Sequence, residues 1–151
     1  MNKQIDDTDM AILRALSRNA RASYREVATE INAAVGTVQH RIQKLEEKGI
    51  LCGFQPVINY NRLGYDVDAI VALETPRESH EDLDKVLRKN RNVKSIYRTT
   101  GDVDMFIRVQ FKSPEELYKF LMNELTDKIV KRSKTYVVLD KWRSDTKLLD
   151  I

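Results

Sequence analysis

The chain has 151 residues, of which 42% are hydrophobic and 32% charged, an ordinary balance for a globular protein of one domain or two small ones. No apolar run reaches the roughly 18 residues needed to span a membrane, and the N-terminus lacks the apolar core of a secretory signal. One cysteine allows neither an internal disulfide framework nor a cysteine-built zinc site. We therefore expect a protein of the reducing cytoplasm that is not a membrane protein.

The first stretch of the chain predicts three short helices. Asp7 or Asp9 can cap a first helix, on which apolar residues recur at helical spacing until about residue 19. Ser23 and Glu26 have the spacing of a capping box, which starts a second helix. A tight turn through Asn32 follows, because asparagine tolerates a positive φ.

The third helix, from about Val35 to Lys48, has the pattern of a DNA recognition helix. One side carries a single apolar stripe, and Gly49 is placed to end the helix. The other side exposes short or hydrogen-bonding side chains, which can pair with base edges, while Arg41 and Lys44 can hold phosphates. The candidate DNA-binding residues are Tyr24, Arg25, Gly36, Thr37, Gln39, His40, Arg41, Gln43 and Lys44.

The charge of this region is compatible with that interpretation. Between Met10 and Leu45 there are six basic and two acidic side chains, although the net charge of the whole chain is only +3. Such a local excess is typical of a phosphate-binding face, but it also suits the solvated surface of a helical bundle. The charge pattern alone leaves both readings open.

Residues 51–64 are expected to form an extended wing or linker strand followed by a loop, with the domain boundary between Asn59 and Tyr65. This divides the chain into a helix-turn-helix domain over residues 1–50, the linker, and a second domain over residues 65–151.

The second domain reads β-α-β-β-α-β. Strands are expected at about 67–75, 93–99, 105–111 and 131–142, with helices at about 81–89 and after Ser113, which is placed as an N-cap. This is the ferredoxin-like order, in which both helices cover one face of an antiparallel sheet, so the fold class is α+β. The first and third strands are apolar on both faces in this pattern, and the face away from the helices is expected to meet another subunit.

The turn between the second and third strands is a candidate ligand site. Glycine allows a close turn whose amides can face an anion, and Asp102 and Asp104 can accept hydrogen bonds from an ammonium group. An amino acid offers both charges, but a plain hairpin turn explains the same residues. The candidate effector-binding residues are Arg98, Thr99, Thr100, Gly101, Asp102, Val103 and Asp104, with Tyr118, Ser133, Lys134 and Thr135 as weaker members.

Catalytic machinery is not recognisable in the sequence. There is no glycine-rich phosphate loop, no nucleophile elbow and no cluster of histidine or cysteine, since His40 and His80 are the only histidines. We therefore predict no catalytic residue, no metal site and no cofactor other than a small-molecule effector.

At this point an ordered set of residues resembles a known family, that of the leucine-responsive regulatory protein and AsnC, the feast/famine regulators. The resemblance runs from Ile5 to about Leu149. The matching residues are Ile5, Asp6, Asp9, Ile12, Leu13, Leu16, Arg21, Ser23, Glu26, Val27, Ile31, Val38, Arg41, Ile42, Leu45, Glu46, Gly49, Ile50, Gly53, Leu63, Gly64, Gly101 to Asp104 and Thr135 to Val138.

The resemblance implies a prokaryotic, nucleoid-associated transcription regulator with a winged helix-turn-helix and a ferredoxin-like sensing domain. Such proteins pair through the linker and the sheet, their dimers assemble into octamers, and they bind amino-acid effectors with the Gly-Asp-x-Asp loop. Two copies are expected to read a pseudo-palindromic promoter site on double-stranded DNA.

The sequence departs from the family pattern around the turn of the helix-turn-helix. Asn32 replaces a common glycine, Ala34 replaces the usual serine cap, and Val35 stands where proline is common. Thr8 replaces a usual apolar residue. The recognition helix is therefore expected to start less firmly, and base contacts cannot be copied from relatives.

Three alternatives stay open at this stage. The chain can be a constitutive or architectural DNA-binding regulator without an effector, or a sensing module whose helix-turn-helix no longer binds DNA. A branch with this architecture decarboxylates sirohaem, but the linker around Cys52 has no basic cluster for a tetrapyrrole carboxylate, and His80 is the only histidine of the second domain.

Overall fold

The computed structural model describes residues 5–126 and 128–141. The chain divides into two compact units, whose described parts cover residues 5–57 and 58–141. Within these ranges no helix is long and apolar enough to cross a membrane. Each unit has its own hydrophobic core.

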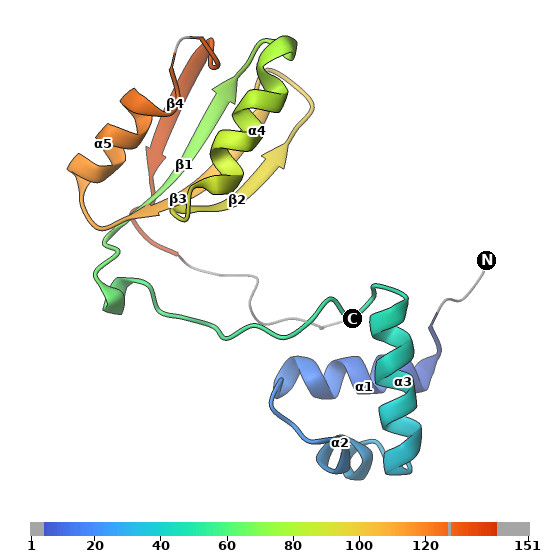
Figure 1. Ribbon diagram of the computed structural model, residues 1–151. Helices are drawn as coiled ribbons and strands as arrows, with labels where there is room; N and C mark the ends of the chain where they lie inside the picture. The colour runs from blue at the N-terminus through green and yellow to red at the C-terminus, as the bar shows by residue number, and fades with distance from the viewer. Residues whose placement is uncertain (1–4, 127, 142–151) are drawn as a thin grey trace. The chain divides into compact units, whose positions relative to one another are not determined.

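The first unit contains the three predicted helices, α1 (Asp7–Arg18), α2 (Tyr24–Glu30) and α3 (Val35–Glu47) (Figure 1). The core between them is small and wholly apolar. Its buried residues are Ile12, Leu13, Ala15, Leu16, Val27, Ala28, Val38, Ile42 and Leu45. The predicted stripe of the third helix is confirmed at Val38, Ile42 and Leu45, but its first member, Val35, is 43% exposed at the start of α3, so its burial was wrongly predicted.

The helix ends follow from local hydrogen bonding, with one correction. Asp6, and not Asp7 or Asp9, is the N-cap of α1, because its carboxylate accepts from the backbone N–H of Asp9 while Asp9 accepts from that of Asp6. Ser23 caps α2 as predicted. Gly49, with φ of 65°, follows the C-cap of α3, as expected of a C′ glycine.

The expected strand between residues 51 and 64 is not formed in the structure. Residues 52–59 are extended without strand partners in the described chain, and a 3-10 turn, η1 (Asn61–Leu63), follows. Apolar side chains of this segment are exposed, among them Phe54, Val57 and Ile58. The Cys52 thiol is also exposed and donates to the carbonyl oxygen of Gly49 at 3.2 Å.

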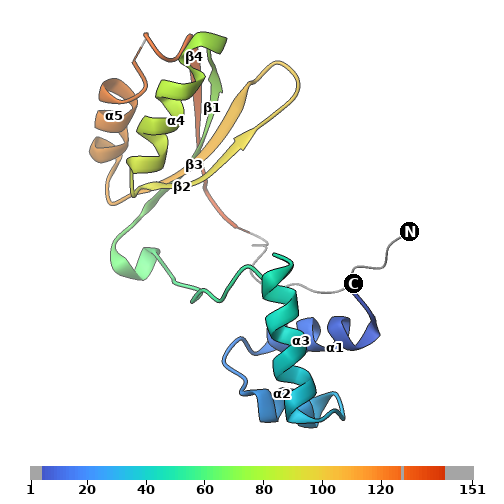
Figure 2. The ribbon, with the colours of Figure 1, turned by 45° about the vertical axis from the view of Figure 1, so that its right-hand side comes forward.

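The second unit has the predicted β-α-β-β-α-β order. Its elements are β1 (Val67–Glu74), the 3-10 turn η2 (Arg77–Ser79), α4 (His80–Lys89), β2 (Val93–Arg98), β3 (Met105–Phe111), α5 (Pro114–Asn123) and β4 (Arg132–Val137). The sheet is antiparallel, with the strand order β2-β3-β1-β4. Both helices cover the same face of the sheet (Figures 1 and 2), which confirms the ferredoxin-like α+β prediction.

Some predicted boundaries in this unit were wrong. The last strand ends at Val137, although the backbone N–H of Val138 still donates to the carbonyl oxygen of Asp68 at 2.8 Å; Trp142, the expected end, lies outside the described residues. Helix α5 ends at Asn123, and Leu125, which follows the C-cap Glu124, still packs into the core.

The face of the sheet away from the helices was expected to be apolar on the first and third strands. The structure shows that it is not. Asp68 of β1 is buried on this face and accepts hydrogen bonds from Arg108 at 2.7 and 3.1 Å and from Gln110 at 2.9 Å. Lys141 forms an ion pair with the same carboxylate. Burial alone raises the pKa of Asp68, but these donors outweigh burial and lower its pKa to about 2.

Candidate nucleic-acid interface and ligand site

Helix α3 presents a polar face opposite its buried stripe. The exposed members of the predicted DNA-binding set on this helix are Gly36, Thr37, Gln39, His40, Gln43 and Lys44. Tyr24 and Arg25, in the first turn of α2, are exposed as well. Helices α2 and α3 therefore expose all these residues to solvent, where short polar groups and cations suit base edges and phosphates.

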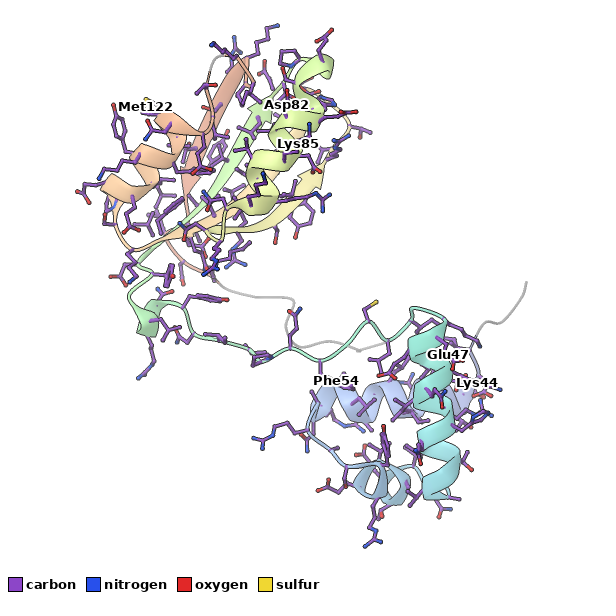
Figure 3. The ribbon with its side chains drawn as sticks, viewed as in Figure 1. Lys44, Glu47, Phe54, Asp82, Lys85 and Met122 are labelled. Atoms are coloured by element: carbon purple, nitrogen blue, oxygen red, sulfur yellow. The ribbon has the colours of Figure 1, made fainter. Side chains whose placement is uncertain are left out.

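One acidic residue on this face was not anticipated. Gln43 donates its amide N–H to Glu47 at 2.9 Å, one helical turn further on. Figure 3 shows Lys44 and Glu47 on α3. The bond to Glu47 uses one of the two amide N–H donors of Gln43, and the second N–H and the amide oxygen are left for a base edge.

The turn into α3 combines a strained residue with an uncapped helix start. Asn32 has φ of 53°, the one positive φ of a non-glycine residue in the described chain, which confirms the predicted turn. Ala34 is the N-cap and supplies no side-chain hydrogen bond. The first backbone N–H groups of α3 therefore lack the acceptor that a serine provides.

Arg41 differs from the other candidates because it is bound to carboxylates of α1. Its Nη1 donates to Asp9 at 3.1 Å and forms an ion pair with Asp6. The pKa of Asp6 is held below its usual value first by the backbone N–H of Asp9 and then by the guanidinium. The pKa of Arg41 is raised, mainly by Asp6 and then by Asp9.

The loop between β2 and β3 is a closed hairpin fixed to the end of β1. The backbone N–H of Thr99 donates to the carbonyl oxygen of Asp104 at 3.0 Å, and its hydroxyl donates to that of Val103 at 2.6 Å. Gly101 has φ of 113°, a conformation that other residues rarely adopt. The backbone N–H of Asp104 donates to Leu73 at 3.1 Å, so the loop is held from both sides.

The two acidic residues of this loop have different surroundings. The carboxylate of Asp104 accepts from the backbone N–H of Thr75 at 2.8 Å and so joins the hairpin to the end of β1. Asp102 lies at the exposed tip, beside Gly101. Of the two, Asp102 is the better placed to accept from an arriving ammonium group.

A shallow groove of about 370 Å³ adjoins the start of this loop, between α4 and the edge strand β2. Arg98 lines it together with Asp84 and Arg88, which hold each other at 2.6 Å. Both signs of charge are therefore present there. Of these three residues, only Arg98 was predicted for a ligand site, because Asp84 and Arg88 lie on a helix whose apolar residues indicate packing against the sheet.

The weaker ligand candidates are not gathered with the loop within one chain. Ser133 and Arg98 lie on the helix-covered face, in one cross-strand row with Leu73 and Met105 between them. At the usual strand spacing this row puts them about 14 Å apart. Lys134 pairs with Ala72 on the other face, Thr135 is half-buried, and Tyr118 is exposed on α5.

Thr75 is a residue of this region that the sequence did not single out. It is buried, and its hydroxyl has no hydrogen-bond partner among the described residues, although its backbone N–H is bound to Asp104. No periodic signal could find it, because the contact joins residues 29 positions apart. In residues 5–126 and 128–141, no three histidine, cysteine or acidic side chains gather as a metal site.

Two family models match the chain, in agreement with the two units. The model described as winged helix-turn-helix DNA-binding matches residues 5–51. The model described as Lrp/AsnC ligand binding domain matches residues 68–148. Fold and sites thus define a class of protein, a DNA-binding regulator with a separate ligand-binding domain.

Curated relatives extend over the same length. The HTH-type transcriptional regulator Ptr1 of Methanocaldococcus jannaschii is 36% identical, over 95% of this chain and 98% of its own. An HTH-type transcriptional regulator of Pyrococcus abyssi is 35% identical over 95% and 98%. The chain belongs to the Lrp/AsnC family and is a transcription regulator with a helix-turn-helix DNA-binding domain and a ligand-binding domain.

Solved structures share the whole fold. AsnC of Escherichia coli is 29% identical, with a TM-score of 0.85 over 94% of this chain and 98% of its own. A complex of the transcriptional regulator NMB0573 of Neisseria meningitidis with L-Met has a TM-score of 0.90 over 96% of both chains, and its 22% identity indicates the fold alone.

Proposed function

We propose that two copies of this chain read a pseudo-palindromic promoter site on double-stranded DNA and that a free amino acid modulates this binding. One observation carries the DNA half, the exposed polar face of α3 above its buried stripe. In a symmetric dimer two such helices enter successive major grooves about 34 Å apart.

Each group of candidate residues has its own part in this proposal. Gln39 and His40, near the start of α3, hydrogen-bond base edges, and Thr37 contacts a base or a phosphate. Lys44 and Arg25 neutralise phosphates, because both are exposed cations on the helices that face the duplex. Gly36, Tyr24 and Gln43 complete the interface.

The effector site is proposed at the hairpin from Arg98 to Asp104. Asp102 accepts from the ammonium group, the amides around Gly101 and the guanidinium of Arg98 face the carboxylate, and Asp104 holds the loop closed. The Neisseria regulator, solved as a complex with L-Met, supports only that a protein of this fold takes up an amino acid.

A second copy is proposed to complete this site. Arg98 and Ser133 lie at opposite edges of one sheet, about 14 Å apart at ordinary strand spacing, which exceeds the reach of a small amino acid. Residues such as Tyr118, Lys134 and Thr135 then serve a neighbouring copy's loop. We accordingly propose a dimer that assembles further into an octamer, acting in the prokaryotic cytoplasm on the nucleoid, without catalytic activity of its own.

The DNA half is tested by selecting bound sequences from a random DNA pool. We expect a two-fold symmetric motif. Gln39→Ala and His40→Ala should weaken binding to it by about tenfold or more, the value of one lost base contact. Lys85→Ala, a matched surface change on α4, should leave binding unchanged (Figure 3). A motif-free pool, or equal losses with Lys85→Ala, would overturn the DNA half.

The effector half is tested by a thermal-shift screen of the twenty amino acids. A ligand at a hundred times its Kd adds about 2.7 kcal/mol of stability, and Asp102→Ala should abolish that shift. No shift with any amino acid would favour a constitutive DNA-binding regulator instead.

A further inference from the structure

Arg41 pairs with the carboxylate oxygens of Asp6 and Asp9 that take no part in capping α1. Asp6 caps α1 with Oδ1, and Asp9 returns the bond to the Asp6 backbone with Oδ2. The remaining oxygens, Oδ2 of Asp6 and Oδ1 of Asp9, both face Nη1 of Arg41. All four oxygens thus have partners, and one guanidinium nitrogen bridges two carboxylates whose spacing the capping box fixes.

The position of Arg41 on α3 separates it from the polar face. Each residue of an α-helix turns the direction by about 100°, so Arg41 points about 40° from buried Leu45, whereas His40 points about 160° from buried Val38. Arg41 is accordingly half-buried and His40 is exposed. The side chain belongs to the flank of α3 that faces α1.

We infer that Arg41 is a positioning residue for DNA recognition, which fixes the rotation of α3 against the start of α1, and that it holds no DNA phosphate. This inference rests on the proposed DNA-binding function. Asp9 is the buried partner, with 9% of its side chain exposed, so it has little freedom to follow if α3 rotates. The two carboxylates thereby set the direction in which Gln39 and His40 leave the helix.

Neutralising the carboxylates separates this role from a phosphate contact, because the two roles predict opposite signs. If Arg41 held a phosphate, Asp6→Asn and Asp9→Asn would release it and remove negative charge, so affinity for the selected DNA would rise. If Arg41 positions α3, both variants should lose about tenfold in affinity for the selected site, comparable to one weakened base contact, while their affinity for random DNA stays the same or rises with the loss of negative charge.

Asp6→Asn is the variant that guards against misfolding, since asparagine caps helices as well as aspartate and the exposed site needs no repacking. The salt dependence supplies an independent readout. Arg41→Met should lower specific affinity without changing the slope of log affinity against log salt, whereas loss of a phosphate contact in each half of a dimer would change that slope by about 1.8.

Increased affinity of the asparagine variants for the selected site, or a reduced salt slope in Arg41→Met, would overturn the inference while leaving the proposed function intact. Wild-type protein that selects no DNA motif would overturn both. Lost specificity at an unchanged slope, in variants that unfold at the wild-type temperature to within a few degrees, is the expected result.

Discussion

Five aspartates of this chain have four different roles, and the surroundings of each side chain decide its role. Asp6 and Asp9 close the start of α1, and Asp68 is buried among donors of the sheet. Asp104 accepts from a backbone N–H, while Asp102 stands exposed two residues earlier. A ligand that binds a carboxylate already bonded within the protein only exchanges one hydrogen bond for another. A ligand that binds exposed Asp102 adds a hydrogen bond without breaking one inside the protein, so Asp102 is the more favourable acceptor.

The two aspartates of the hairpin should therefore separate stability from sensing. Asp104→Ala should lower the free energy of unfolding by about 1 kcal/mol, because the Thr75 N–H loses its acceptor. Asp102→Ala should leave it unchanged and lose only the effector response. Urea unfolding followed by circular dichroism measures both variants. Equal destabilisation by the two substitutions would contradict this division.

The uncapped start of α3 offers a gain in stability. Ala34→Thr should raise the free energy of unfolding of the first unit by about 1 kcal/mol, since the hydroxyl accepts from a free N–H of the first turn. Ala34→Val has nearly the same shape without an acceptor and is the matched control. The prediction fails in chemical denaturation if valine stabilises the unit as much as threonine does.

Among the elements, the sheet is the one whose stability should depend on acidity. The pKa of Asp68 is about 2 in the folded protein and near the ordinary aspartate value of 3.8 when unfolded. A lowered folded pKa contributes stability that is fully present above the unfolded pKa and is lost as the pH falls towards 2.

Asp68→Asn tests this dependence. The variant should be less stable than wild type at pH 6, and the difference should shrink by about 2 kcal/mol as the pH is lowered from 5 to 2. Urea unfolding at a series of pH values measures it. A pH-independent difference would mean that the pairing of Arg108 and Lys141 with Asp68 is not what stabilises this face.

Elements with local start signals were predictable from the sequence, and contacts between distant residues were not. Ser23 and Ser113 set the starts of α2 and α5 through neighbours three residues away. Three aspartates within four positions made the cap of α1 ambiguous until its geometry was known. The contacts of Arg41 with Asp9 and Asp6 join residues 32 and 35 positions apart, which no period of a helix or strand can indicate.

The same distinction applies to the candidate sites. The exposed face of α3 could be predicted because a buried stripe defines its opposite side. Strand alternation already predicts that Ser133 and Lys134 leave the sheet on opposite faces. Only the register shows that Ser133 shares a row with Arg98, and that Asp68 lies beside Arg108 and Gln110.

At the scale of the whole molecule, DNA affinity should depend on salt through the first unit alone. In a dimer, Lys44→Ala removes two phosphate contacts and should reduce the slope of log affinity against log salt by about 1.8. Lys85→Ala removes the same charge from α4, where Asp82 pairs with it at 3.1 Å, and should leave the slope unchanged. Fluorescence anisotropy at several salt concentrations measures both. Equal slopes in the two variants would mean that general charge, and not α3, draws the DNA.

The exposed thiol in the extended segment makes this protein suitable for spectroscopy without engineering. Cys52 is the chain's only cysteine, so a maleimide spin label attaches at one known position after the DNA-reading helices. A symmetric dimer then carries two labels, and pulsed electron paramagnetic resonance measures the distance between them. Recording that distance with and without an amino acid, on free and DNA-bound protein, follows the transmission of an effector signal through the native sequence.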